Sequence, residues 1–215
     1  MTTPGPDDPA SFWNEKFNQT EYRYGTSPNA FVEATLPEKL TAGASVLCVG
    51  DGEGRNGVWC AEQGFETTSI EPSSVGAQKI KALAEKRGVE VSVICDRMPS
   101  DAVEANRFDA VVLTFIHAPP EIRRQIHSAS IEALAPGGLL VLEAFTPAQR
   151  ENNRPSGGPP SLALLFTPEM LQEDFEELEI SQLSEEVVEL DEGAGHRGPA
   201  DVVRLIARKP VAAHK

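Results

Sequence analysis

Basic residues are few in this sequence. Its 215 residues include 19 Lys and Arg against 33 Asp and Glu, which gives a formal net charge of −14. Nucleic acids and anionic membrane surfaces bind proteins through clustered basic side chains, and the acidic stretch 169–192 offers no basic face in compensation. We therefore expect neither nucleic acid nor a membrane as a partner. A small-molecule substrate, or a basic protein, fits this charge better.

Long apolar runs are also lacking. The longest candidate, residues 139–142, is interrupted by Glu143 and falls far short of the roughly 20 residues that cross a bilayer. The amino terminus has neither the basic region nor the apolar stretch of a signal peptide. The cytoplasm is therefore the expected compartment.

Cysteine and histidine are sparse and scattered. The cysteines at 48, 60 and 95 form no CxxC pair, and we expect all three to pack in the core as small hydrophobes. The four histidines show no HExxH spacing, so no metal site is expected.

What the sequence does have is a regular alternation of apolar β-branched segments with helical segments that end at glycine. This pattern predicts βαβ units around a parallel sheet. Two final apolar segments have no helix between them and should pair as an antiparallel hairpin. The predicted fold is α/β: a Rossmann-like, seven-stranded, mostly parallel sheet with an antiparallel C-terminal hairpin and helices on both faces. Strands are expected at residues 45–49, 66–71, 90–95, 108–115, 139–145, 177–189 and 201–209, and helices at 12–18, 28–36, 55–63, 73–87, 120–134 and 168–175.

The length suits one domain, which we place at residues 12–209 between a disordered tail at 1–11 and a short tail at 210–215. Its parts are N-terminal cap helices (12–40), a cofactor-binding half (41–145) and a substrate-side half (146–209). Ser27 followed by Pro28 predicts an N-cap and first helical position in the cap region. A Pro-, Gly- and Asn-rich loop is expected at 146–160.

The turn Gly50-Asp51-Gly52-Glu53-Gly54 lies between a predicted strand and helix. Glycines there let backbone N–H groups approach a ligand closely. Residues 52–57 also match GxGxxG, the dinucleotide fingerprint. Two cofactors therefore remain possible: NAD(P), or S-adenosylmethionine.

Acidic residues follow the next two strands. Glu71, at the end of the second strand, is positioned to accept hydrogen bonds from ribose hydroxyls. Asp96, after the third, could accept from an adenine amino group, with Arg97 and Met98 contributing backbone polarity and an apolar ring contact. The antiparallel end of the sheet and the lack of a second domain favour S-adenosylmethionine.

The segments 46–56 and 69–73 resemble the first two motifs of class I S-adenosylmethionine-dependent methyltransferases, and residues 134–141 resemble the turn before their fifth strand. More narrowly, GEGRN at 52–56, YGTSPN at 24–29 and GGP at 157–159 resemble the tellurite-resistance and thiopurine methyltransferase group. The resemblance spans residues 12–208. It implies a cofactor site formed by the residues Tyr24, Gly50, Asp51, Gly52, Gly54, Arg55, Asn56, Glu71, Pro72, Asp96, Arg97, Met98 and Thr114.

One position departs from the family pattern. Cys48 stands where these enzymes usually carry an acid that organises the glycine turn, and a thiol is a poor hydrogen-bond acceptor. Asp51, within the turn, is the expected partial substitute.

On the acceptor side, the resemblance points to His117 after the fourth strand and to His196 in an EG-x-x-H-x-G segment. Arg150, with Arg154, is expected to help bind an oxyanion, while Trp13, Tyr22 and Tyr24 are expected in a lid. The resemblance implies methyl transfer to a small molecule, and we expect a monomer or homodimer. A thiol or a chalcogen oxyanion such as tellurite comes first as acceptor, and a carboxylate or hydroxyl second. Two alternatives stay open: a non-catalytic S-adenosylmethionine-binding or interaction module, and an NAD(P)-linked oxidoreductase.

Overall fold

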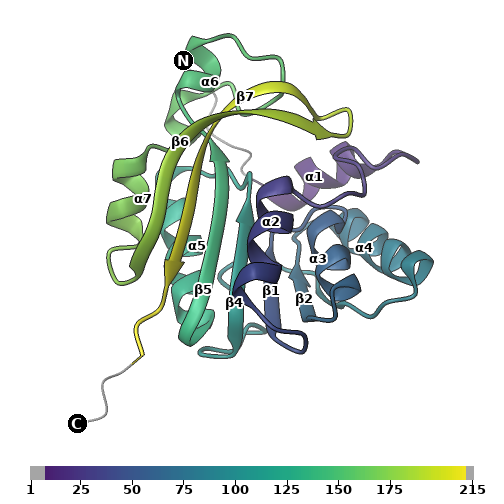
Figure 1. The fold of residues 1–215 in the computed structure, drawn as a ribbon. Helices are drawn as coiled ribbons and strands as arrows, with labels where there is room; N and C mark the ends of the chain where they lie inside the picture. Colours follow the sequence, from purple (N-terminus) through teal and green to yellow (C-terminus); the bar gives the residue numbers. More distant parts are fainter. Residues whose placement is uncertain (1–7, 212–215) are drawn as a thin grey trace.

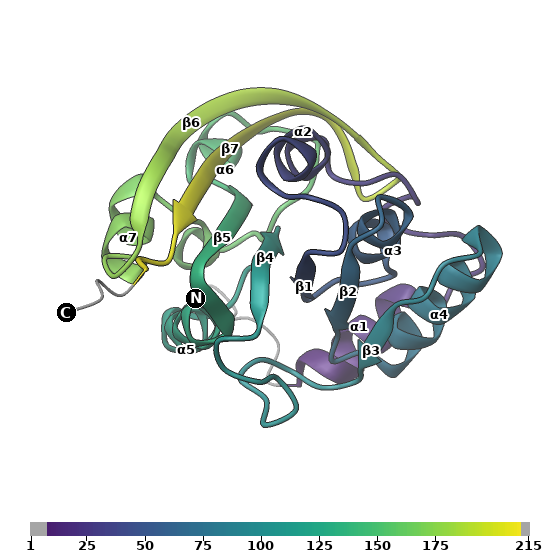
Figure 2. The same ribbon diagram turned by 60° about the horizontal axis from the view of Figure 1, so that its bottom comes forward.

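The apolar segments form one seven-stranded sheet in the computed structural model, which describes residues 8–211 (Figures 1 and 2). Its order is β3-β2-β1-β4-β5-β7-β6, and β7 runs antiparallel to both of its neighbours. The predicted α/β class and the antiparallel C-terminal hairpin are confirmed. The strands are β1 (Ser45–Val49), β2 (Glu66–Ile70), β3 (Ser92–Ile94), β4 (Phe108–Thr114), β5 (Leu134–Phe145), β6 (Glu179–Glu192) and β7 (His196–Arg208).

Helices cover both faces of this sheet. Because side chains alternate along a strand, Leu47 and Val49 of β1 face one core cluster and Val46 and Cys48 face the other. The first cluster includes residues of α5 and α7, and the second includes residues of α2 and α3. The helices are α1 (Pro9–Phe17), α2 (Ala30–Lys39), α3 (Arg55–Glu62), α4 (Ser74–Arg87), α5 (Pro120–Ala133), α6 (Ala148–Glu151) and α7 (Pro168–Asp174), with a 3-10 turn η1 (Leu162–Leu164).

The amino-terminal helix starts earlier than predicted. Asp8 accepts hydrogen bonds from the N–H groups of Ala10 and Ser11, so α1 begins at Pro9. The predicted disordered tail is therefore wrong for residues 9–11, while residues 1–7 and 212–215 lie outside the described part of the chain.

The second helix is capped by a different residue from the one predicted. Asn29, not Ser27, accepts hydrogen bonds from Phe31 N and Val32 N, so α2 begins at Ala30 and Pro28 precedes it. An Asn side chain is as good an N-cap as Ser, and the local sequence does not choose between them.

The third strand is shorter than predicted, ending at Ile94. Cys95 is therefore exposed, which corrects its placement in the core, whereas Cys48 and Cys60 are buried.

The C-terminal strands are longer than predicted. They turn at residues 193–195, and the hairpin curves over the carboxyl ends of β4 and β5 towards the N-terminal segment (Figure 1). There Gly195 N donates to Arg23 O at 3.0 Å. Within residues 8–211, no helix combines the length and apolar character that crossing a membrane requires.

Candidate functional site

The glycine turn leaves β1 at the carboxyl edge of the sheet. Gly50 and Gly52 have φ of 57° and 61°, a left-handed conformation that residues with a Cβ rarely adopt. Gly50 N donates to Ile70 O at 2.8 Å, which fixes the turn against the end of β2. Gly54, with φ of 96°, is the N-cap of α3.

The side chain of Asp51 points into the protein. Its carboxylate accepts from Gly57 N at 3.2 Å and from Ser69 Oγ at 2.6 Å, which links the first turn of α3 to β2. Burial raises the pKa of this carboxyl to about 6. Cys48, by contrast, packs in the core with 1 % exposure. The acid that holds the glycine turn is therefore at position 51 rather than 48.

Glu71 directly follows β2 and is bound to the glycine turn. Its Oε2 accepts from Gly52 N and its Oε1 from Ser73 N, each at 2.8 Å. Burial raises the pKa of the Glu71 carboxyl to about 8, and the Asp51 and Glu53 carboxylates add to the shift. The turn and the acid predicted from sequence are thus brought into direct contact.

An aromatic cluster from α1 and the following segment covers this region. The Trp13 and Phe17 rings stack with centroids 5.2 Å apart, and a Cβ on Gly52 would lie 3.3 Å from the Phe17 ring. Asn14 accepts from Val75 N at the start of α4. Tyr24 lies 6.5 Å from Trp13 between ring centroids. The segment predicted as a lid therefore packs directly over the glycine turn.

The residues after β3, which were predicted to contact the adenine, differ in exposure. Asp96 is exposed and accepts from Arg97 N and Ser100 Oγ, and the Ser100 hydrogen bond lowers its pKa. Arg97 is exposed, whereas the Met98 side chain is buried in the core. Met98 therefore packs in the core below the carboxyl edge of the sheet, and Asp96 lies at the surface of that edge.

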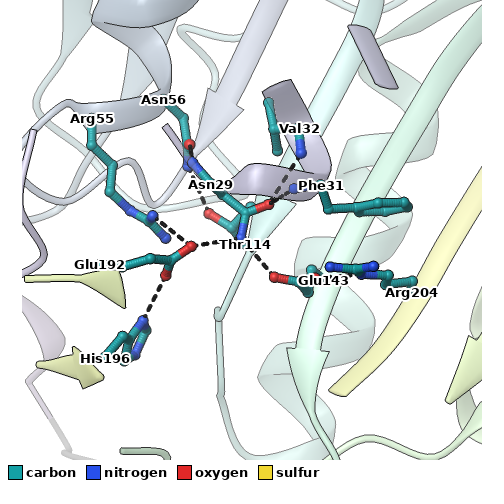
Figure 3. Close-up of polar contacts among 10 residues, drawn as sticks. All are labelled: Asn29, Phe31, Val32, Arg55, Asn56, Thr114, Glu143, Glu192, His196 and Arg204. Carbon is teal, nitrogen blue, oxygen red and sulfur yellow. Dashed lines mark hydrogen bonds and ion pairs between the residues drawn. The ribbon is translucent and has the colours of Figure 1, made fainter. Parts of the chain in front are cut away.

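A buried polar network joins the start of α3 to the C-terminal hairpin (Figure 3). Its centre is Asn29, 1 % exposed, whose Nδ2 donates to Glu143 at 2.6 Å and to Glu192 at 2.9 Å. Asn29 N also donates to Asn56 Oδ1 at 2.8 Å. Asn56 in turn donates to Thr114 Oγ1 at 2.9 Å, so these two predicted cofactor residues bind each other.

Two guanidinium groups balance the carboxylates of this network. Arg55 Nη1 lies 2.9 Å from Glu192, and Arg204 Nε donates to Glu143 at 2.6 Å. Arg55, predicted at the cofactor, therefore reaches the hairpin instead of standing free at the turn. Burial would raise the pKa of Glu192, but the His196 hydrogen bond and Arg55 outweigh it and bring the pKa to about 2.

His196 is held inside this site. Its Nδ1 lies 3.0 Å from Glu192 Oε2, and its ring is 4.5 Å from the rings of Tyr24 and Phe115 and 5.2 Å from Phe145, measured between centroids. Burial lowers the pKa of the imidazole, although Glu192 opposes that shift.

His117 is differently placed. Its Nδ1 is 2.7 Å from Leu164 O, and its Nε2 accepts from Phe145 N at 3.3 Å. Burial lowers the pKa of the ring to about 4. Both ring nitrogens are thus occupied by backbone, and the neutral imidazole joins β5 to the turn η1.

The arginines predicted to bind an oxyanion have protein partners. Arg150 donates to the carbonyl oxygens of Gly157, Gly158 and Pro159. Arg154 pairs with Asp201 at 2.6 Å. Both shape the loop that closes over His196, and neither presents an uncommitted guanidinium. Within the described residues, no group of three or more His, Cys, Asp or Glu is arranged to hold a metal ion.

Sequence reasoning missed Asn29 and Glu192 as site residues. The available signals were the place of Asn29 at the end of the segment 24–29 and that of Glu192 at the start of the segment that holds His196. Pro72 directly follows Glu71, and its predicted role at the cofactor stays a prediction.

Comparison with known proteins agrees with this geometry. A family model described as a methyltransferase domain matches residues 46–138. No curated protein matches the chain in sequence. Similar solved structures include the [4+2]-cyclase SpnF (TM-score 0.73, 19 % identity, covering 99 % of this chain and 98 % of that one). TehB from Haemophilus influenzae is also similar (TM-score 0.64, 22 % identity, 93 % and 66 %), as is the N-methyltransferase NodS from Bradyrhizobium japonicum WM9, in complex with S-adenosylhomocysteine (TM-score 0.68, 16 % identity, 95 % and 100 %).

These structural similarities, all at low identity, establish the fold. The family match covers β1 to the start of β5, which includes the glycine turn and Glu71. Residues 46–138 therefore match a methyltransferase domain, and the fold around them is the one that the similar S-adenosylmethionine-dependent methyltransferase structures share.

Proposed function

We propose that this chain transfers the methyl group of S-adenosylmethionine to a small-molecule acceptor. The observation that carries the proposal is the hydrogen bond from Gly52 N to Glu71, which sets a glycine turn beside a carboxylate at the carboxyl edge of parallel strands. Open α/β sheets bind ligands at this edge. The methyltransferase-domain match over the same residues favours S-adenosylmethionine over NAD(P).

The residues present fit this cofactor. Glu71 would accept from the ribose hydroxyls with the lone pairs that Gly52 and Ser73 leave free, and Asp96 would face the adenine. The backbone of residues 50–54 would approach the amino-acid portion. When bound, the cofactor supplies an already activated methyl group, so the protein has to orient the acceptor and exclude water. The aromatic cluster of Trp13, Phe17 and Tyr24 covers the turn and would act as the lid.

The acceptor side lies under the hairpin. We propose that His196 contacts the acceptor, because it stands between the ends of β4 and β5 with aromatic rings around it. His117 and Arg150 would act by shaping this side, since their polar atoms bind backbone. Candidate acceptors are a thiol or a chalcogen oxyanion first, and a carboxylate or hydroxyl second.

The alternative function is binding of the cofactor without methyl transfer. SpnF, which shares this fold over nearly the whole chain, is described as a [4+2]-cyclase. A domain of this fold that binds the cofactor without transferring its methyl group is therefore the alternative to keep.

Calorimetry with S-adenosylmethionine, S-adenosylhomocysteine and NAD separates these functions. We expect both sulfur nucleosides to bind and NAD not to bind. If neither sulfur nucleoside bound below about 1 mM, roughly −4 kcal/mol, the proposal would be wrong. Release of S-adenosylhomocysteine with a panel of tellurite, selenite, thiols, thiopurines and small acids then distinguishes methyl transfer from cofactor binding alone.

A further inference from the structure

Glu192 fixes which nitrogen of His196 carries a proton. Its Oε2 can only accept, and it lies 3.0 Å from Nδ1, so Nδ1 is the protonated nitrogen. Its Oε1 accepts from Asn29 Nδ2 at 2.9 Å and is paired by charge with Arg55, whose Nη1 lies 2.9 Å away. Glu192 is therefore locked as the acceptor for Nδ1. The lone pair of His196 is left on Nε2, which has no hydrogen-bond partner in the described part of the chain.

The groups that face His196 keep this imidazole neutral and able to accept a proton. Arg55 of α3 and Arg23 of the N-terminal segment oppose a positive charge on the ring, as burial does, while Glu192 favours it. His117, the other histidine facing it, is itself neutral because burial lowers its pKa to about 4. Glu192 is positioned to stabilise the imidazolium once a proton arrives.

The basic groups of this region are only partly paired, because Arg23 Nε and Arg55 Nη1 are buried without a hydrogen-bond partner in residues 8–211. Arg150 is committed to backbone carbonyls and Arg154 to Asp201. Arg197, next to His196 in sequence, is exposed and pairs with Asp191 at 3.3 Å. Two buried carboxylates, Glu143 and Glu192, share the Asn29 amide nearby.

We propose that His196, oriented by Glu192, accepts the proton of an uncharged protic acceptor, a hydroxyl or a thiol. This inference rests on the proposed function. The acceptor atom loses its proton to Nε2 and uses its electron pair to bond the methyl carbon, while the sulfonium sulfur keeps the electron pair of the bond that breaks. His196 is the catalytic residue, and Glu192, Asn29 and Arg55 are positioning residues.

The test is Glu192→Gln. Because Asn29 and Arg55 are donors, the amide oxygen must face them, which turns the amide NH₂ towards His196 Nδ1. The ring is then forced into the other tautomer, with its proton on Nε2, and can no longer accept one. Glu189→Gln is the matched control, because Glu189 is exposed on the same strand.

Nitrogen NMR of the histidines reads the tautomer in the protein without cofactor. We expect the proton on Nδ1 in the wild type and in Glu189→Gln, and on Nε2 in Glu192→Gln. A wild-type protein with the proton on Nε2 would overturn the inference, even if the variant failed to fold.

Kinetics complete the test. Glu192→Gln should lower kcat for the hydroxyl or thiol acceptor at least about 100-fold and leave the dissociation constant of S-adenosylmethionine within about twofold. Tellurite as the preferred acceptor, or an unchanged kcat in Glu192→Gln, would overturn the inference while leaving methyl transfer intact. Loss of cofactor binding by the wild type would instead overturn the proposed function itself.

Discussion

Replacing Asn29 by alanine removes the centre of the buried network. The side chain caps α2 through two N–H groups and donates to two buried carboxylates. Losing the cap costs about 1 kcal/mol, and each hydrogen bond to a charged group contributes about 1.5–3 kcal/mol. Arg55 and Arg204 stay beside the carboxylates, so we expect a loss below the sum, about 3–5 kcal/mol in the free energy of unfolding.

Urea denaturation followed by circular dichroism measures this change. Asn18→Ala is the control, because Asn18 is exposed at the end of α1 and should change the unfolding free energy by less than about 0.5 kcal/mol. A loss below 1 kcal/mol for Asn29→Ala would refute the reasoning.

Asn29→Asp tests the hydrogen bonds that the Asn29 amide donates separately from its role as the N-cap of α2. Aspartate caps helices as well as asparagine does, but it would place a third carboxylate against Glu143 and Glu192. Its pKa should be raised in the folded protein, so the folded state binds the extra proton and the variant regains stability as the pH falls. We expect it to be less stable than Asn29→Ala at pH 8. Equal stability of Asn29→Asp and the wild type at that pH would show that the amide does not donate to the carboxylates.

Three further predictions concern single side chains. Glu71→Ala should weaken S-adenosylmethionine binding by about 1–3 kcal/mol, measured by calorimetry against the exposed control Glu66→Ala; an unchanged affinity would remove Glu71 from the site. Burial raises the pKa of Glu71 from 4.5 to about 8, so between these values the folded state holds a proton that the unfolded chain releases. The unfolding free energy of the wild type should therefore fall relative to that of Glu71→Gln as the pH rises from about 5 to 8, and parallel curves of unfolding free energy against pH would contradict this. Asp174→Asn should lower the unfolding free energy by about 3–5 kcal/mol, because Asp174 Oδ2 lies 2.7 Å from both Arg123 Nε and His127 Nδ1 at a buried position. Chemical denaturation measures this loss against the exposed control Glu173→Gln, and a loss near zero would contradict the buried ion pair.

The order of segments in the sequence largely determined the fold. Alternating apolar strands and glycine-terminated helices admit few topologies, because strand-helix-strand connections are almost always right-handed. The glycine turn and Glu71 were predictable for the same reason. Each directly follows a strand, and neighbouring parallel strands end at the same edge. The exact ends of α1, β3 and the hairpin depended on capping and pairing that the local pattern does not specify.

Only the tertiary structure decided what the polar side chains near that edge do. Asn29 is 114 residues from Glu143 and 163 from Glu192, and no local pattern relates positions so far apart. Arg150 and His117 carry the right chemistry for a ligand, yet their polar atoms bind backbone groups of the protein. A residue type sets which hydrogen bonds a side chain can make. The packing of distant segments sets which of them are already made, and in residues 8–211 it pairs Nδ1 of His196 with Glu192 while Nε2 has no partner.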